Sequence, residues 1–151
     1  MSTDQRLIQK FKLQPHPEGG YYRRTYTSSD QRFSSILFLL TKNNFSAFHK
    51  IDSDEQWNWY SGDAIHIHEI DTEGNYTLTQ LTNEIGNENF QYVVKSGNWF
   101  AAESVGHEGF SLCGCTVIPA FDFSNFELAA YNILLQKYPQ HDVILRRFTR
   151  V

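Results

Sequence analysis

The sequence lacks several features that mark particular classes of protein. Its only cysteines, Cys113 and Cys115, are two residues apart, which on a strand is the far limit of disulfide geometry, so we expect free thiols in a reducing compartment. No apolar run approaches the roughly eighteen residues of a membrane helix, and the longest, Ile36 to Leu40, has the length of a strand. The first residues also lack the apolar segment of a secretory signal. These absences predict a cytoplasmic protein with no membrane partner.

Motifs of several common catalytic mechanisms are absent as well. There is no Gly-x-Ser-x-Gly turn of a serine hydrolase, no glycine-rich phosphate-binding loop and no Cys-x-x-Cys pair. Lys and Arg form no long run, and the net charge is −4. The nearest approach to a basic patch is Arg146, Arg147 and Arg150. Nucleic acid is therefore not an expected partner.

The composition that remains is that of a folded domain. With 151 residues, of which 15% are aromatic and 20% charged, the chain can bury a core. No linker or internal repeat divides it, so we expect a single domain over residues 1–151.

The middle of the chain is a series of short segments rich in β-branched and aromatic residues, each bounded by turn residues. The predicted strands cover residues 21–27, 34–41, 46–51, 56–60, 64–70, 76–82, 90–94, 100–103 and 110–118. Their close spacing indicates an all-β sandwich or barrel.

Helices are expected only near the two ends of the chain. Ser2 opens a weak capping box, which predicts a short helix as far as Phe11. The stretch from Ser124 to Glu127 is a second capping box, followed by apolar residues at helical spacing as far as Tyr138, after which a proline stops the pattern. We expect this C-terminal helix to pack on the outside of the barrel.

The segment from His49 to His68 concentrates the side chains that could carry chemistry. Because alternate strand residues share a face, Glu55, Trp57 and Trp59 are expected to point the same way. If this face is exposed, the tryptophans leave a large apolar area in contact with water. If it is buried, the carboxylate must be hydrogen-bonded or have a functional role. A pocket wall satisfies both requirements. A partner interface and an ordinary buried hydrogen bond are the alternatives.

The histidines allow more than one interpretation. His66 and His68 could reach one metal ion together with His49 and Glu55, a set that suits Mn, Fe, Zn or Ni. Alternatively, His66 faces solvent or a neighbouring strand, while His49 contacts a ligand or acts as a general base near its usual pKa of about 6.5. The remaining histidines are in loop-like settings and are expected at the surface. They are His16, His107 and His141.

Nearly the whole chain resembles a known family. Glu55 followed after six residues by Gly62, with His49 upstream, resembles the first motif of the cupins, small barrels of the jelly-roll type. Other segments resemble one small single-domain cupin family of unknown function. They are Pro15 to Tyr22 with Arg23, Ser46 with His49, Asp54 to Trp57, Tyr60 to Asp63, His68, Gly97 with Trp99, Cys115 to Pro119 and Phe121 to Leu128.

The resemblance implies a double-stranded β-helix barrel, similar in fold to deoxy-sugar nucleotide epimerases. It also implies a homodimer, and pairing would cover the open edges of a jelly roll. Metal-binding cupins carry His-x-His before the Glu and a further His in the second motif, whereas Ala47 and Phe100 stand at two of these places. A metal cofactor is therefore not expected, and a divalent ion at His49, Glu55 and His68 is the alternative.

Three functions follow from the resemblance and the polar segment. The first is metal-independent isomerase or epimerase chemistry on a sugar-like molecule, with His49, Glu55 and His68 as catalytic groups. The second is a binding module that holds a small molecule, such as a sugar or nucleotide sugar, without changing it. The third is a metal-dependent cupin enzyme. The expected ligand contacts are Arg23 for an anionic group, Trp57 or Trp99 for stacking on a ring, and Ser46 and Tyr60.

Overall fold

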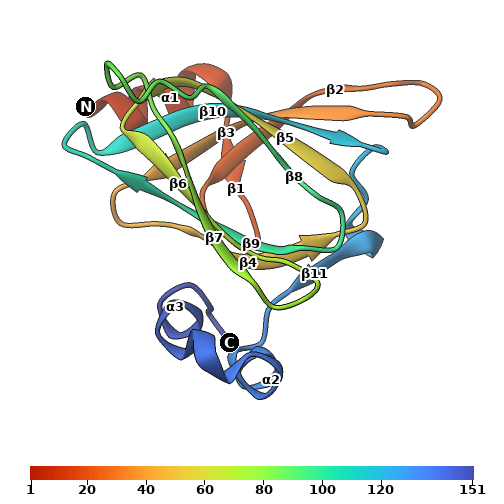
Figure 1. The fold of residues 1–151 in the computed structure, drawn as a ribbon. Coiled ribbons are helices and arrows are strands. Elements are labelled where there is room, and N and C mark those ends of the chain that lie inside the picture. The colour runs from red at the N-terminus through yellow and green to blue at the C-terminus, as the bar shows by residue number, and fades with distance from the viewer.

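Two antiparallel sheets lie face to face and enclose the core (Figure 1). The structure, a computed structural model, describes residues 1–151. The six-stranded sheet has the order β1-β2-β3-β10-β5-β8, with the bounds Gln14–Pro15, Tyr21–Thr27, Ser34–Thr41, Phe110–Ile118, Asp54–Gly62 and Gln91–Val94. The five-stranded sheet has the order β11-β4-β9-β6-β7, with the bounds Phe126–Leu128, Ser46–Ile51, Trp99–Val105, Ala64–Ile70 and Tyr76–Leu81. This arrangement is a jelly roll, which confirms the predicted fold class.

Strand alternation sorts the side chains between the core and the outer surfaces. In β6, Ile65 and Ile67 are fully buried between the two sheets, and each such burial contributes roughly 1.5–3 kcal/mol. His66 and His68 occupy the intervening positions, so they face the outer side of the five-stranded sheet. There the ring of His68 packs against Phe148, with ring centroids 4.6 Å apart. The two faces of this sheet therefore carry separate groups of side chains.

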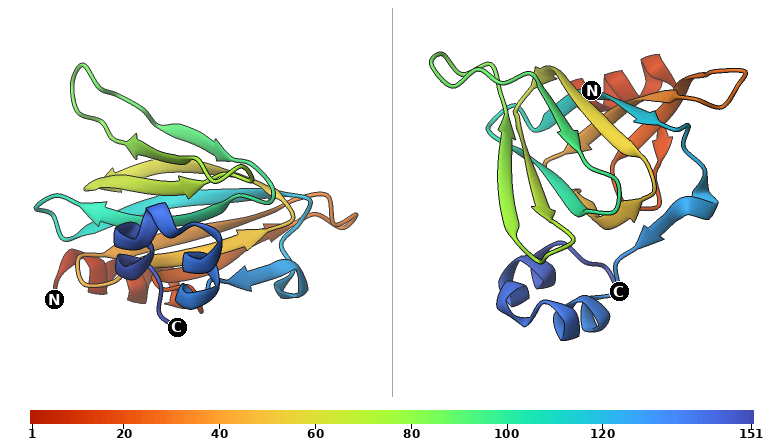
Figure 2. Two further views of the ribbon diagram at one scale, coloured as in Figure 1. Left: turned by 60° about the horizontal axis from the view of Figure 1, so that its bottom comes forward. Right: turned by 45° about the vertical axis from the view of Figure 1, so that its right-hand side comes forward.

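Short helices cover the outer faces of both sheets. Helix α1 (Thr3–Phe11) begins at the Ser2 capping box, as predicted, and its apolar side packs on the six-stranded sheet. Helices α2 (Tyr131–Lys137) and α3 (Asp142–Arg147) lie on the opposite side of the molecule, against the five-stranded sheet (Figure 2). None of the helices has the length and apolar character required to cross a membrane.

The C-terminal helix predicted from residue 124 is wrong in its start, and a second helix, α3, follows it. Residues Phe126–Leu128 instead form β11, which pairs with β4 at the edge of the sheet. The Asp122 side chain accepts a hydrogen bond from the backbone of Ser124, which closes a 3-10 turn in place of a helix start. Backbone pairing with the exposed edge of β4 outweighs the local capping signal, and the helical segment begins only at Tyr131.

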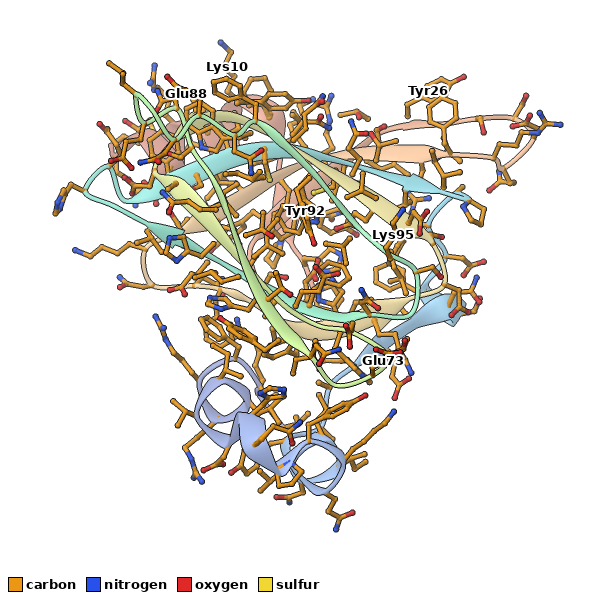
Figure 3. The ribbon with its side chains drawn as sticks, in the orientation of Figure 1. Lys10, Tyr26, Glu73, Glu88, Tyr92 and Lys95 are labelled. Carbon is orange, nitrogen blue, oxygen red and sulfur yellow. The ribbon has the colours of Figure 1, made fainter.

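A polar cluster inside the barrel is fully satisfied by protein groups. The Tyr92 hydroxyl donates to one carboxylate oxygen of Glu69, and the Asn98 amide donates to the other at 2.7 Å. Figure 3 shows Tyr92 in the middle of the molecule, between the sheets. Burial and the Glu69 bond raise the pKa of Tyr92 to about 12. These bonds tie β8 to β6 of the facing sheet.

Candidate functional site

A pocket opens between the six-stranded sheet and strands β4 and β11. It encloses about 500 Å³ when its open mouth is counted. Most of this space belongs to the mouth, so the deep part admits only a small group. Aromatic and aliphatic side chains form most of the lining. The polar side chains that converge on it are His16, Glu18, Arg24, His49 and Glu55.

Glu18 reaches the pocket from the loop between β1 and β2. Gly19 and Gly20 follow it with φ angles of 109° and 78°, a region that favours glycine. A Cβ on Gly19 would lie 1.9 Å from the carbonyl oxygen of Phe45, so this loop needs glycine to approach the chain so closely. The Ala47 amide then donates to the Glu18 carbonyl at 2.7 Å, which ties the loop to β4.

Glu18 and His49 form a buried ion pair in the pocket wall. Their Oε2 and Nε2 atoms are 2.6 Å apart, and the Ser46 hydroxyl donates to the same oxygen at 2.9 Å. Nδ1 of His16 lies 3.2 Å from the second carboxylate oxygen. On the far side of the ring, Nδ1 of His49 donates to the Ala47 carbonyl at 2.7 Å. Since a carbonyl only accepts, Nδ1 carries a proton and Nε2 shares its proton with Glu18.

The environment favours charge on both members of this pair. Burial works to raise the pKa of Glu18, but the charges of His49 and His16 and the hydrogen bonds to the carboxylate outweigh it and lower the pKa. Burial works to lower the pKa of His49, but the carboxylate of Glu18 outweighs it and raises the pKa. For His16, burial prevails and the pKa is lowered. The pair is therefore a carboxylate and an imidazolium beside a neutral histidine.

Glu55 occupies the same pocket in the opposite protonation state. Burial and the nearby charge of Glu18 raise the pKa of its carboxyl to about 8, so Glu55 is neutral at pH 7. Trp57, two residues further along β5, is almost fully buried. Its indole Nε1 lies near the Glu55 carboxyl and acts to lower that group's pKa, but it makes no hydrogen bond of good geometry. An unpaired buried donor is costly and unusual. Because Trp57 lines the pocket, a ligand atom could supply the missing acceptor.

The donor set around His49 does not fit a metal ion of the cupin type. Both ring nitrogens are bonded, to Glu18 and to Ala47. Phe100 packs against the ring with centroids 4.1 Å apart, at a place where metal-binding cupins carry a histidine. With Glu55 as the one uncommitted carboxyl, the pocket lacks the three or four convergent ligands that such an ion requires.

Several residues predicted from the sequence meet in this pocket. His49, Glu55 and Trp57 line it, and Ser46 supports Glu18 from behind. The alternation along β5 put Glu55 and Trp57 on one face, and the structure confirms this shared face. Their roles toward a ligand stay predictions.

His68 and Trp99 lie outside the pocket, contrary to expectation. His68 is on the opposite face of the five-stranded sheet from His49 because it alternates with the core residues of β6. Trp99 belongs to the cluster under the C-terminal helices, where Lys50 lies 4.8 Å from its ring centroid. Neither side chain can contact a ligand that sits beside Glu55.

Arg23 and Tyr60 also face away from the pocket. The Arg23 guanidinium is exposed and donates to the carbonyl of Phe11 at 3.2 Å. Its neighbour Arg24 lines the pocket instead, because neighbouring strand residues point to opposite faces. Tyr60 is half exposed and packs against Gly114 on the outer surface of the sheet.

The sequence interpretation missed the two residues that precede β2 in the pocket. His16 was expected at the surface but is buried. Glu18 lines the pocket, although the sequence predicted no role for it beyond its place in a segment that resembles the family. The signal available was Pro15-His-Pro-Glu-Gly-Gly20, in which an ionisable pair is held between prolines and glycines. Such a rigid, glycine-ended loop is a common carrier of functional side chains.

Comparison with known proteins places the chain in a family. The family described as "Cupin superfamily (DUF985)" matches residues 5–129. A protein from Shewanella oneidensis is 36% identical, over 99% of this chain and 98% of its own, with a TM-score of 0.91. A hypothetical protein from Leishmania major is 28% identical over the whole of both chains, with a TM-score of 0.93.

A more distant likeness concerns the fold alone. Oxalate decarboxylase from Bacillus subtilis is 12% identical over 89% of this chain and 36% of its own, with a TM-score of 0.61. No curated protein matches the chain. The family match and the full-length likeness to the Shewanella oneidensis protein agree with the resemblance seen in the sequence. The chain belongs to the cupin superfamily, within the family DUF985.

Proposed function

We propose that the pocket is a metal-independent acid–base site that moves a proton on a small, oxygen-rich molecule. The observation that carries the proposal is the pair of buried carboxyls, Glu18 ionised and Glu55 neutral, in one pocket. When the environment drives two titratable groups to opposite states at one pH, one can accept a proton while the other donates one. That division of labour is what proton-transfer isomerisation requires.

The free polar groups of the pocket determine the ligand class. Trp57 Nε1 and the protonated carboxyl of Glu55 are both donors, and the Arg24 guanidinium uses one nitrogen on the Phe121 carbonyl and keeps others free. A wall rich in donors favours a ligand rich in acceptors, such as a carbonyl, a carboxylate or a sugar. An anionic substituent would lie at the mouth, near Arg24.

The chemistry follows from these positions. The Glu18 carboxylate accepts a proton from a carbon next to a carbonyl group, while Glu55 delivers its proton to the carbonyl oxygen. Protonated Glu18 then returns a proton to carbon while Glu55 takes its proton back from the enol oxygen, so the atoms balance without a cofactor. His49 acts as a positioning residue, because its imidazolium keeps Glu18 ionised. This assigns the base role to Glu18 in place of His49, whose ring nitrogens are both bonded.

A second candidate is a binding module with no turnover. Oε2 of Glu18 accepts from Ser46 and pairs with His49, and a carboxylate held in this way favours a rigid wall over a proton acceptor. The two candidates share a ligand class and differ in whether the bound molecule exchanges hydrogen with water.

Deuterium wash-in tests the proposal directly. A panel of aldoses, ketoses, sugar phosphates, nucleotide sugars and small 2-oxo acids is incubated with the protein in D₂O, and carbon-bound hydrogen is followed by NMR. We expect exchange in one class, reduced at least about 100-fold in Glu18→Gln and in Glu55→Gln, since general acid–base groups contribute factors of this size. Glu108→Gln, on the exposed surface, is the matched control.

The outcome also separates the two candidates. If no compound exchanges, yet one raises the melting temperature and Trp57→Phe abolishes that rise, the pocket is a binding module. If both carboxamide variants exchange at the wild-type rate, the assignment of acid and base is wrong.

A further inference from the structure

A second cluster of ionisable side chains lies on the outer face of the five-stranded sheet, away from the pocket. It consists of His66 and His68 of β6 and Glu103 of the neighbouring strand β9. We propose that these three residues bind a divalent transition-metal ion, with zinc as the best match to two imidazoles and a carboxylate.

The backbone brings the three side chains together. His66 and His68 are two residues apart on one strand, so they share a face, and Glu103 is the direct cross-strand partner of His66. One ligand atom from each residue lies within 4.8 Å of the others. The tetrahedral ligands of a zinc ion at about 2.0–2.1 Å stand roughly 3.3 Å apart. Rotation of the side chains would have to close the remaining gap.

Groups around the cluster orient the expected ligands. The Tyr76 hydroxyl lies 2.7 Å from Nδ1 of His68, which leaves Nε2 directed at Glu103, 2.7 Å from its Oε2. Arg147 donates to the other oxygen of Glu103 at 2.7 Å and holds the carboxylate in place. Histidines that bind metals ordinarily have their second ring nitrogen bonded in this way. The ion would replace the proton between His68 and Glu103, and Nδ1–H would then donate to Tyr76.

The cluster is accessible to an ion from solution. His66 is half-buried, and the Glu103 side chain is 14% exposed. A hollow with Glu103, Ser104 and Arg147 in its wall lies beside it. A water molecule would complete a four-coordinate site.

The site would join the sheet to the C-terminal helices. His68 packs on Phe148, and Glu103 is bonded to Arg147 at the end of α3. An ion that fixes His68 and Glu103 would therefore stabilise the docking of α3. Any ligand that binds the folded protein alone also raises its stability by mass action.

Metal titration of the stripped full-length protein tests the proposal. Calorimetry with Zn²⁺ and visible spectroscopy with Co²⁺ should both give one ion per chain, with the Co²⁺ spectrum typical of four ligands. We expect at least about tenfold weaker binding in His66→Ala and Glu103→Gln, and weaker binding in Tyr76→Phe, which keeps all three ligands. His107→Ala, which removes an exposed histidine, and Glu18→Gln, in the pocket, should bind as the wild type does.

Three results would overturn the proposal. They are binding well below one ion per chain, binding that His66→Ala leaves unchanged, and binding that Glu18→Gln abolishes, since the last would place the ion in the barrel. Circular dichroism of each variant establishes that it is folded. His66 is half-buried, so its substitution disturbs packing less than that of the buried His68. The His66→Ala variant is therefore the main test of metal binding at this cluster.

Discussion

Glu18 and Glu55 are chemically identical side chains that the fold places in opposite environments. Glu18 has a positive partner at 2.6 Å and a hydroxyl donor, whereas Glu55 has burial and the negative charge of Glu18. Neither state can be predicted from residue type, because both depend on which groups the barrel brings near. At this scale the charge state of the site is a property of the tertiary structure.

The raised pKa of Glu55 makes stability depend on pH. Its folded pKa of about 8 lies above its ordinary value of 4.5, so its contribution is complete below about pH 4.5 and is lost as pH rises through 8. Glu55→Gln imitates the neutral form and removes this loss. Between pH 5 and 8.5 we expect the free energy of unfolding to fall by a few kcal/mol more in the wild type than in the variant. Urea denaturation at both pH values measures the free energy of unfolding. An equal loss in the wild type and in Glu55→Gln would contradict the raised pKa of Glu55.

Removal of one partner from the Glu18–His49 pair should be costly. Glu18→Gln leaves an imidazolium buried without its counter-ion, and such changes cost about 3–5 kcal/mol. Asp30→Asn breaks the exposed pair with Arg32 and should leave the free energy of unfolding unchanged within error. Chemical denaturation of both variants at pH 7 gives the comparison. A Glu18→Gln variant as stable as the control would show that the pair contributes nothing.

Single residues also mark the limit of the sequence interpretation. Alternation along β5 correctly put Glu55 and Trp57 on one face, because the pairing with β10 is regular over that part of the strand. The choice of Arg23 over Arg24 failed because the phase of β2 depends on its pairing with β3, and a shift of one residue exchanges the faces. Glu18 lies in a loop without any periodicity, so no pattern indicated its direction.

At the scale of elements, the loop between β1 and β2 is the part that carries the site. It places Glu18 against β4, and it depends on glycine at the point of closest approach. The predicted strands succeeded because alternation and turn residues are local signals. Strand β11 was missed because its formation depends on the free edge of β4, which no local pattern of residues reveals.

Two glycine substitutions, one in this loop and one between β7 and β8, separate backbone strain from steric contact. Gly19 and Gly86 both have φ near 100°, at 109° and 88°, but a Cβ at Gly86 meets nothing within 4 Å. Gly86→Ala should cost only about 1–2 kcal/mol of strain. Gly19→Ala should cost clearly more, because its Cβ would overlap the carbonyl of Phe45, and it should disturb the Glu18 site. Thermal unfolding measures the loss of stability in both variants. Equal losses would mean that the loop can move away from the Phe45 carbonyl without cost.

At the scale of the whole molecule, the five-stranded sheet divides two kinds of chemistry. Its inner face carries His49 and the pocket, and its outer face carries His68 and Glu103 beside the C-terminal helices. The jelly roll was predictable because many short strands with a resemblance along most of the chain point to one architecture. The placement of His49 and His68 on opposite faces of the sheet was not predictable. It depends on how the strands are ordered and paired in the sheet, which the local sequence does not reveal.

Arg150 joins the end of the described chain to the loop of Glu18. Its guanidinium donates to the Phe45 carbonyl at 2.6 Å and to Asn44 at 2.8 Å, and it packs over the Phe45 ring. Arg150→Ala should speed hydrogen exchange at the Ala47 amide, which bonds to the Glu18 carbonyl. Arg146→Ala, whose guanidinium bonds only within the C-terminal helices, should leave that amide unchanged. Exchange mass spectrometry or NMR reports both, and equal protection in all three proteins would contradict the link.

The bond between Arg150 and the Glu18 carbonyl spans 132 residues of sequence. The Glu18 loop is synthesised before Arg150, so the loop lacks this support until Arg150 has emerged from the ribosome. The barrel can begin to assemble from its neighbouring strands during that time, and the Glu18 loop gains its contact with Arg150 only afterwards. Nascent chains that stop before Arg150 should therefore fold into a barrel before they acquire a pocket able to hold a ligand.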